Sequence, residues 1–218
     1  MNMTIETGLA DGIVLQRGRD GTCDVPITGR ADADATVHAT VRLAGHTVNG
    51  FDRVAIGRCA DGRLDARLSG LPAGGPYDVT LGFGEGGAQT PGGEFRVASV
   101  WVGDVWILAG QSNMQGVGLL ADREPPVEAV RALYMTDRWD IAADPIHTPG
   151  LAVDPVLVGL LGGPGEPSTV VGTGPGVSFG AARHEATGVP QGLLACAHGG
   201  TTMDQWDPAL AGRGGESL

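Results

Sequence analysis

The length, composition and charge of the chain limit what kind of protein it can be. Its 218 residues, 42% of them apolar, can supply the core of one large domain or of two ordinary ones. The formal net charge is −11, and the 14 basic residues are all arginines spread along the chain, which argues against nucleic acid and anionic membranes as partners. There is no apolar stretch of the roughly 18 residues that a membrane span needs, and no visible leader peptide, which favours the cytoplasm.

The first part of the chain, residues 1–98, predicts an antiparallel β-sandwich domain. Short runs rich in β-branched residues recur between turn signals, a spacing typical of such folds. Within the run 36–43, alternation places Val37, Ala39, Val41 and Leu43 on one buried face. The predicted strands are Ile13–Leu15, Val25–Gly29, Thr36–Leu43, Val54–Gly57, Leu64–Leu68, Tyr77–Phe83 and Glu94–Val97.

The cysteines give little indication of a metal site or a disulfide framework. Cys23, Cys59 and Cys196 are odd in number and show no Cys-x-x-Cys spacing. Cys23 and Cys59 could pair if they fell on adjoining strands, but small core or surface positions explain all of them equally simply. We therefore expect no metal and no cofactor.

The pattern changes after Val97, and residues 99–218 predict an α/β domain. Val100–Ala109 is a nearly continuous apolar run, as expected of a strand buried on both faces. Val130–Met135 and Gly192–Ala197 predict further buried strands. A helix is predicted over Gly176–Thr187, with Pro175 near its first turn and Gly188 closing it. The order strand, helix, strand predicts a parallel sheet.

A long segment, Asp137–Thr173, separates two of these elements and contains many prolines and glycines. It predicts no long helix. Loops of this length in a compact domain are usually functional or mobile, so this one could form a wall of a substrate cleft.

A serine, Ser112, directly follows the first buried strand of the second domain. A hydroxyl becomes a nucleophile when it is placed at a sharp strand end, with a base for its proton and donors for the oxyanion. Ser112 sits where such placement is possible. A serine in this position also commonly caps a helix or finishes a turn, so the position alone does not identify a nucleophile.

Two further segments also follow or precede regular elements at the same predicted edge. Val171–Phe179 is a glycine-rich loop opening a helix, where backbone N–H groups could face negative charge, although an ordinary loop has the same pattern. Cys196–Trp206 follows the last buried strand. Because open α/β folds place their sites at the carboxyl edge of the parallel sheet, we expect Ser112 to meet these two segments there.

Three segments in this order, Gly110–Met114, Gly172–Phe179 and Gly199–Trp206, resemble the sialate O-acetylesterase and acetylxylan esterase branch of the SGNH hydrolases. The leading region is similar to the same proteins in Asp11–Arg17, Pro72–Tyr77 and Val102–Trp106, so the likeness spans almost the whole chain. The resemblance implies an N-terminal β-sandwich and then part of an SGNH-type, flavodoxin-like α/β/α domain with a parallel sheet.

The resemblance also implies an activity and roles for particular residues. The chain would be a serine esterase that removes O-acetyl groups from sialate or related sugars through an acetyl-serine intermediate, without a metal. Ser112 matches the nucleophile, and its own N–H would be one oxyanion donor. Gly174 or Gly176 matches the second oxyanion element. The residues matching pocket-shaping positions are Gln111, Asn113, Gly199, Gly200 and Thr201.

The catalytic base is the point at which this sequence departs from the family pattern. Members carry a Gln-Gly-Glu-Ser/Asn-like segment and then an Asp-x-x-His that supplies base and carboxylate, whereas this sequence ends at Gly214–Leu218 before either. We expect a further C-terminal segment or a complementing chain to supply them. His198 is the histidine at a predicted strand end, and we expect it to contact substrate or pack beside the site, with a role as substitute base as the lesser alternative. The competing hypothesis is a non-catalytic carbohydrate-binding or scaffold module without a complete triad.

Overall fold

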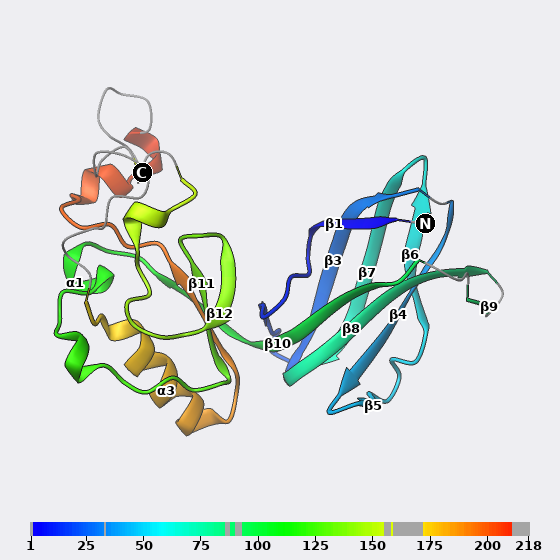
Figure 1. Ribbon diagram of the computed structural model, residues 1–218, viewed down its shortest axis with the longest axis horizontal. Helices are drawn as coiled ribbons and strands as arrows, with labels where there is room; N and C mark the ends of the chain where they lie inside the picture. The colour runs from blue at the N-terminus through cyan, green and yellow to red at the C-terminus, as the bar shows by residue number, and fades with distance from the viewer. Residues whose placement is uncertain are drawn as a thin grey trace. The chain divides into compact units, whose positions relative to one another are not determined.

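The computed structural model describes residues 2–32, 34–85, 88–89, 93–154, 158 and 172–210 (Figure 1). The chain divides into two compact units, Met1–Asp104 and Val105–Leu218. Strand β10, Phe95–Leu108, runs from the first unit into the second, and the expected boundary after residue 98 lies inside it. Among the described residues there is no helix that is both long and apolar enough to span a membrane.

The first unit is built from strands paired as one continuous sheet. The strand order is β1-β3-β7-β6-β4-β8-β10, and the pairs along this path are antiparallel, whereas β2 pairs with β10 in parallel. The sandwich expected from the sequence is therefore not seen as two separately paired sheets. The strands are β1 (Met3–Thr7), β2 (Val14–Gln16), β3 (Thr22–Ala31), β4 (Ala35–Leu43), β5 (His46–Thr47), β6 (Val54–Ala60), β7 (Arg63–Pro72), β8 (Gly74–Glu85), β9 (Ala88–Gln89) and the start of β10.

The core of this unit comes from the alternating face of its strands. Val37, Ala39 and Val41 are fully buried, as the alternation predicts. Leu43 is 38% exposed, because it is the last residue of β4 and stands at the hairpin turn into β5. Cys23 and Cys59 are buried free thiols, and β7 lies between their strands, so the disulfide considered from the sequence does not form.

The second unit holds a small mixed sheet whose strand order is β10-β13-β11-β12. β11 and β13 are parallel, as expected, and β12 adds an antiparallel edge. A flavodoxin-like sheet places its first strand between the second and the third. Here, when the antiparallel edge strand β12 is left aside, the last strand in the chain, β13, lies between β10 and β11. The strands are β11 (Val130–Tyr134), β12 (Arg138–Ile141) and β13 (Gln191–Ala195); the helices are α1 (Ser112–Gln115) and α3 (Pro175–Thr187); the 3-10 turns include η2 (Pro149–Leu151), η3 (Met203–Trp206) and η4 (Pro208–Leu210).

Helix α3 packs on β11 and β13 and has the ends predicted from the sequence. Pro175 occupies its first turn, and Gly188 closes it in a left-handed conformation with its N–H donated to the His184 carbonyl. Gly180 faces the sheet, and a Cβ there would lie 2.6 Å from Val130 Cγ1. The glycine therefore allows the helix to approach the sheet closely.

The segment expected as a long loop, 137–173, is more ordered at its start than the sequence indicated. It contains strand β12 and the turn η2. Residues 155–157 and 159–171 lie outside the described part, so the proposed cleft wall can be followed only in the remaining residues, of which Asp137 and Ala152 to Asp154 line a cavity.

Candidate active site

Ser112 begins helix α1, and three residues separate it from the last residue of strand β10, Leu108. The turn between them requires Gly110, which has φ +148°, and a Cβ there would lie 3.0 Å from Met114 Cβ. The amides of Met114 and Gln115 both donate to the Gln111 carbonyl, each over 2.9 Å. Ser112 is half-buried, and its neighbours Gln111 and Asn113 are exposed.

The segment after β13 lies directly beside this turn. The N–H of His198 donates to the Gly110 carbonyl over 2.9 Å. The N–H of Gly199 donates to Gln115 Oε1 over 2.6 Å, and a Cβ built on Gly199 would lie 3.9 Å from Ser112 Cα. The structure thus brings together the two segments that the sequence placed at one sheet edge.

The glycine-rich loop before α3 meets α1 at its other end. Gly118 and Thr173 exchange backbone hydrogen bonds in both directions, each of 3.1 Å. A Cβ on Gly174 would lie 2.9 Å from the Met114 carbonyl oxygen. The Gly174 N–H donates a hydrogen bond to Asp144 Oδ1 over 3.4 Å. This loop therefore supports the turn that carries Ser112 from the side of Met114, and the Gly174 amide is engaged by Asp144.

Gly176, the other glycine that the sequence proposed as an oxyanion donor, is buried in the first turn of α3. A Cβ there would lie 2.7 Å from Leu108 Cδ1, so the absence of a side chain allows α3 to approach the end of β10. Its contact is a packing contact.

Thr201 links His198 to Trp206 through a short chain of hydrogen bonds. The buried Thr201 hydroxyl donates to the His198 carbonyl over 2.8 Å and accepts the indole N–H of Trp206 over 2.9 Å. His198 is itself buried, with 7% of its surface exposed, and Gly200 forms an exposed turn with φ +80°. The loop after β13 is thus held in one conformation by its own side chains.

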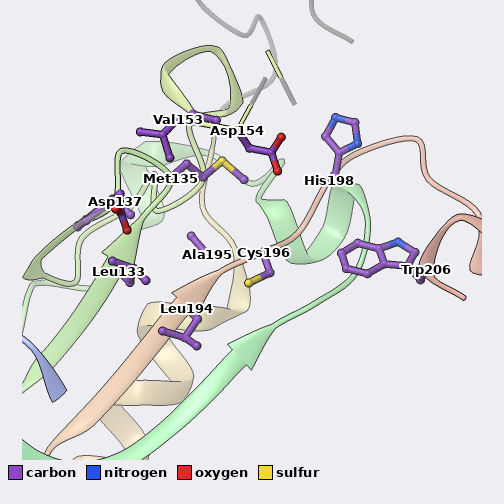
Figure 2. Close-up of a pocket in the computed structure, with 12 residues that line it drawn as sticks. Leu133, Met135, Asp137, Val153, Asp154, Leu194, Ala195, Cys196, His198 and Trp206 are labelled. Atoms are coloured by element: carbon purple, nitrogen blue, oxygen red, sulfur yellow. The ribbon is translucent and has the colours of Figure 1, made fainter. Parts of the chain in front are cut away.

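Two cavities open beside these residues, and Trp206 lines both. One, of about 510 Å³, lies between the end of β10 and the loop that follows β13; it is lined by Ala109, Gly110, Gln111, Thr201, Thr202, Met203 and Trp206. The other, of about 380 Å³, is bounded by Trp206 and His198 on one side and by Leu133 and Asp137 on the other (Figure 2). Both volumes fall in the range of small-molecule sites.

The sequence reasoning missed a buried polar pair below the site. Asp144 is 9% exposed, and burial raises the pKa of its carboxyl group. His147 is 2% exposed, and burial lowers the pKa of its imidazole to about 4, although the backbone of Gln115 and Leu108 opposes the shift. Asp144 accepts the Gly174 N–H, and the His147 imidazole interacts with the backbone of Gln115 and Leu108. Asp144 and His147 stand in a proline-rich stretch without periodicity, so no pattern marked them.

The described residues contain no group of three or more His, Cys, Asp or Glu side chains arranged to hold a metal ion. Cys196 lines the smaller cavity as an exposed free thiol. The chemistry available at the site consists of a hydroxyl, an imidazole, amides and an indole.

Known proteins similar to this chain are carbohydrate esterases. A probable carbohydrate esterase of Arabidopsis thaliana is 29% identical over 143 residues, which cover 56% of this chain and 49% of that protein. The crystal structure of a carbohydrate acetylesterase from Xanthomonas citri matches with a TM-score of 0.58 and 22% identity over 99% of this chain and 45% of that one, which shows a common fold. The chain thus spans about half the length of these relatives. Residues 102–216 match the family model described as carbohydrate esterase, sialic acid-specific acetylesterase, and the chain belongs to this family.

Proposed function

We propose that this chain carries the nucleophile of a serine esterase that removes O-acetyl groups from carbohydrates, with sialate or a related sugar as substrate. The observation that carries the proposal is the placement of Ser112 at the end of β10, with Gly199 against its Cα and the larger cavity beginning at Gly110 and Gln111. Membership of a carbohydrate esterase family supports an ester as the substrate.

The proposed reaction proceeds through an acetyl-serine intermediate. Ser112 Oγ attacks the acetyl carbonyl carbon, its proton passes to a base, and the sugar oxygen departs with a proton as the C–O ester bond breaks. Water then attacks the acetyl-serine and releases acetate, which regenerates the hydroxyl. The structure limits the oxyanion donors, because the Gly199 and Gly174 amides are already donated to Gln115 and Asp144.

The N–H of Ser112 is the oxyanion donor that we propose. It is the first amide of α1, and the first amides of a helix have no carbonyl partner within it. Asn113 is exposed beside it on the same turn and keeps its proposed role in shaping the pocket.

The base is proposed to come from an Asp-x-x-His segment of the kind that the family carries. His198 is the alternative within the described residues, because its backbone is bonded to the turn that presents Ser112. Replacing His198 with Gln separates these possibilities: a base at His198 loses almost all activity, whereas a wall residue retains part of it.

The experiment measures acetate release from p-nitrophenyl acetate and from acetylated sugars, using this chain and a form extended to the length of its relatives. Ser112→Ala in the extended form should lower the rate by at least about 10³-fold, because triad members act as one unit. Ser178→Ala, an exposed serine on α3, is the matched control and should keep the rate.

Equal inactivity of both wild-type forms would contradict the esterase assignment. Sugar binding without acetate release in the extended form would instead favour the non-catalytic carbohydrate-binding module.

A further inference from the structure

Trp206 stands at the boundary between the two cavities of the second unit. It lines the cavity of about 510 Å³ that begins at Gly110 and Gln111, and also the cavity of about 380 Å³ that contains His198. Its indole ring is half-buried, so part of its surface remains available to a ligand. A ligand that fills the larger cavity therefore touches both this ring and the turn that presents Ser112.

The orientation of the ring is fixed before any ligand arrives. The indole N–H is donated to Thr201 Oγ1, which in turn donates to the His198 carbonyl. The turn η3 that carries Trp206 begins with a capping box, in which Thr202 and Gln205 satisfy each other's backbone amides. Because the N–H is already donated within the loop, the part of the half-buried ring that remains for a ligand is apolar.

The larger cavity has an uncharged lining over the residues that the structure describes. Its side chains are those of alanine, glutamine, threonine, methionine and tryptophan. The carboxylate of Asp137 lines the adjoining cavity on the far side of Trp206, and the chain carries a net charge of −11. The electrostatic setting therefore disfavours an anionic ligand over a neutral one.

We infer that Trp206 is a stacking platform for the sugar ring of a neutral acetylated carbohydrate bound in the larger cavity, beside Ser112. A pyranose ring has a face of C–H groups that packs on an aromatic ring, and its hydroxyl groups suit the amide of Gln111 and the hydroxyl of Thr202. This inference rests on the proposed esterase function for the position of the acetyl group, and among the substrates proposed there it favours a related neutral sugar over sialate, which carries a carboxylate.

The first test is binding, which requires no turnover. Titration of the Ser112→Ala chain with acetylated xylose, followed by calorimetry and by the indole N–H resonance of Trp206, should show saturable binding and a shift of that resonance. Trp206→Ala should weaken binding roughly tenfold, and Trp206→Phe should weaken it less because a ring remains. Trp139→Phe, a half-buried tryptophan of β12 outside both cavities, is the control.

The second test compares two substrates in the extended enzyme. Trp206→Ala should raise KM for the acetylated sugar by roughly tenfold more than KM for p-nitrophenyl acetate, which has no sugar ring. Equal losses on both substrates would overturn the platform, as would tighter binding of an O-acetylated sialic acid than of the neutral sugar. If acetate release proves independent of Ser112, the esterase proposal fails, while the binding titration still decides whether Trp206 holds a sugar.

Discussion

The two units differ in what they bury. In the first unit, the buried side chains that the structure describes are apolar, and they come from the alternating faces of the strands. In the second unit, an apolar cluster is accompanied by buried polar or charged residues: Gln115, Arg131, Asp144, His147, Gln191, His198 and Thr201. Every buried polar or charged side chain among the described residues thus belongs to the unit that holds Ser112.

This difference indicates where function is located. Burying a polar group costs free energy unless it finds a partner, and a partner requires a defined geometry. Apolar burial has no such requirement and serves stability in general. Three of the buried polar side chains, those of Gln115, Asp144 and Thr201, make hydrogen bonds that hold the loops around Ser112. The second unit therefore uses buried polarity to position backbone.

The largest expected effect tests the apolar half of the comparison. Leu81 of β8 is fully buried, so Leu81→Ala should lower the free energy of unfolding of the first unit by about 2–5 kcal/mol, measured by urea denaturation. Leu81→Met, which keeps the volume, should cost less than about 1.5 kcal/mol. Hydrogen exchange of the α3 and β13 amides should stay unchanged; faster exchange there would show that the two cores are not separate.

The next effect concerns His147 and pH. Because its pKa is about 4 in the folded chain and about 6.5 when unfolded, protons bind preferentially to the unfolded state between these values. The contribution of the neutral His147 imidazole to the free energy of unfolding is present above pH 6.5 and is lost as the pH falls towards 4. The free energy of unfolding therefore decreases by about 3 kcal/mol over this range. The raised pKa of Asp144 acts in the opposite direction, since burial there disfavours the ionised form as pH rises.

The measurement is urea denaturation of the wild type and of His147→Gln at several pH values from 7 to 4. In the variant, the free energy of unfolding should fall much less between pH 7 and pH 4 than in the wild type. His46→Gln, an exposed histidine on β5, should keep the wild-type dependence. Identical profiles for the wild type and His147→Gln would mean that the imidazole is not held neutral by its surroundings.

The smallest effect separates hydrogen bonding from charge at Asp144. Asp144→Ala leaves the Gly174 N–H without its acceptor and should destabilise the second unit by about 1–3 kcal/mol. Asp144→Asn retains an oxygen for this bond and removes a buried carboxyl group, so its loss should be smaller. Thermal or urea unfolding of both variants at pH 7 measures the difference. Equal destabilisation by Asn and Ala would show that the carboxylate charge, rather than the acceptor, supports the loop.

Some features of this fold follow from the sequence because they depend on local pattern. Alternation identified the buried face of β4 up to Val41, and Pro175 with Gly188 marked the ends of α3. The approach of Gly199 to Ser112 followed from the rule that parallel strands end at one sheet edge. Each of these inferences needs only a local pattern of residue types or the common direction of parallel strands.

Other features depend on contacts that no local pattern encodes. The position of β13 between β10 and β11 is set by packing across the sheet, and no strand order was predicted from the sequence. The hydrogen bonds of Gly174 to Asp144 and of Gly199 to Gln115 connect residues far apart in the chain. The sequence could therefore name the glycines of the site but could not say which of their amides were already engaged.

The close approach of backbone to backbone around α1 sets limits on how this site can be redesigned. A Cβ on Gly116 would lie 2.5 Å from the Gly172 carbonyl oxygen, and one on Gly172 would lie 2.2 Å from that of Gly118. Randomising these positions to broaden substrate range would yield misfolded variants, because no rotamer change relieves a clash with main chain. Met203, which is 83% exposed on the wall of the larger cavity, is the more tolerant position at which to begin an engineering library.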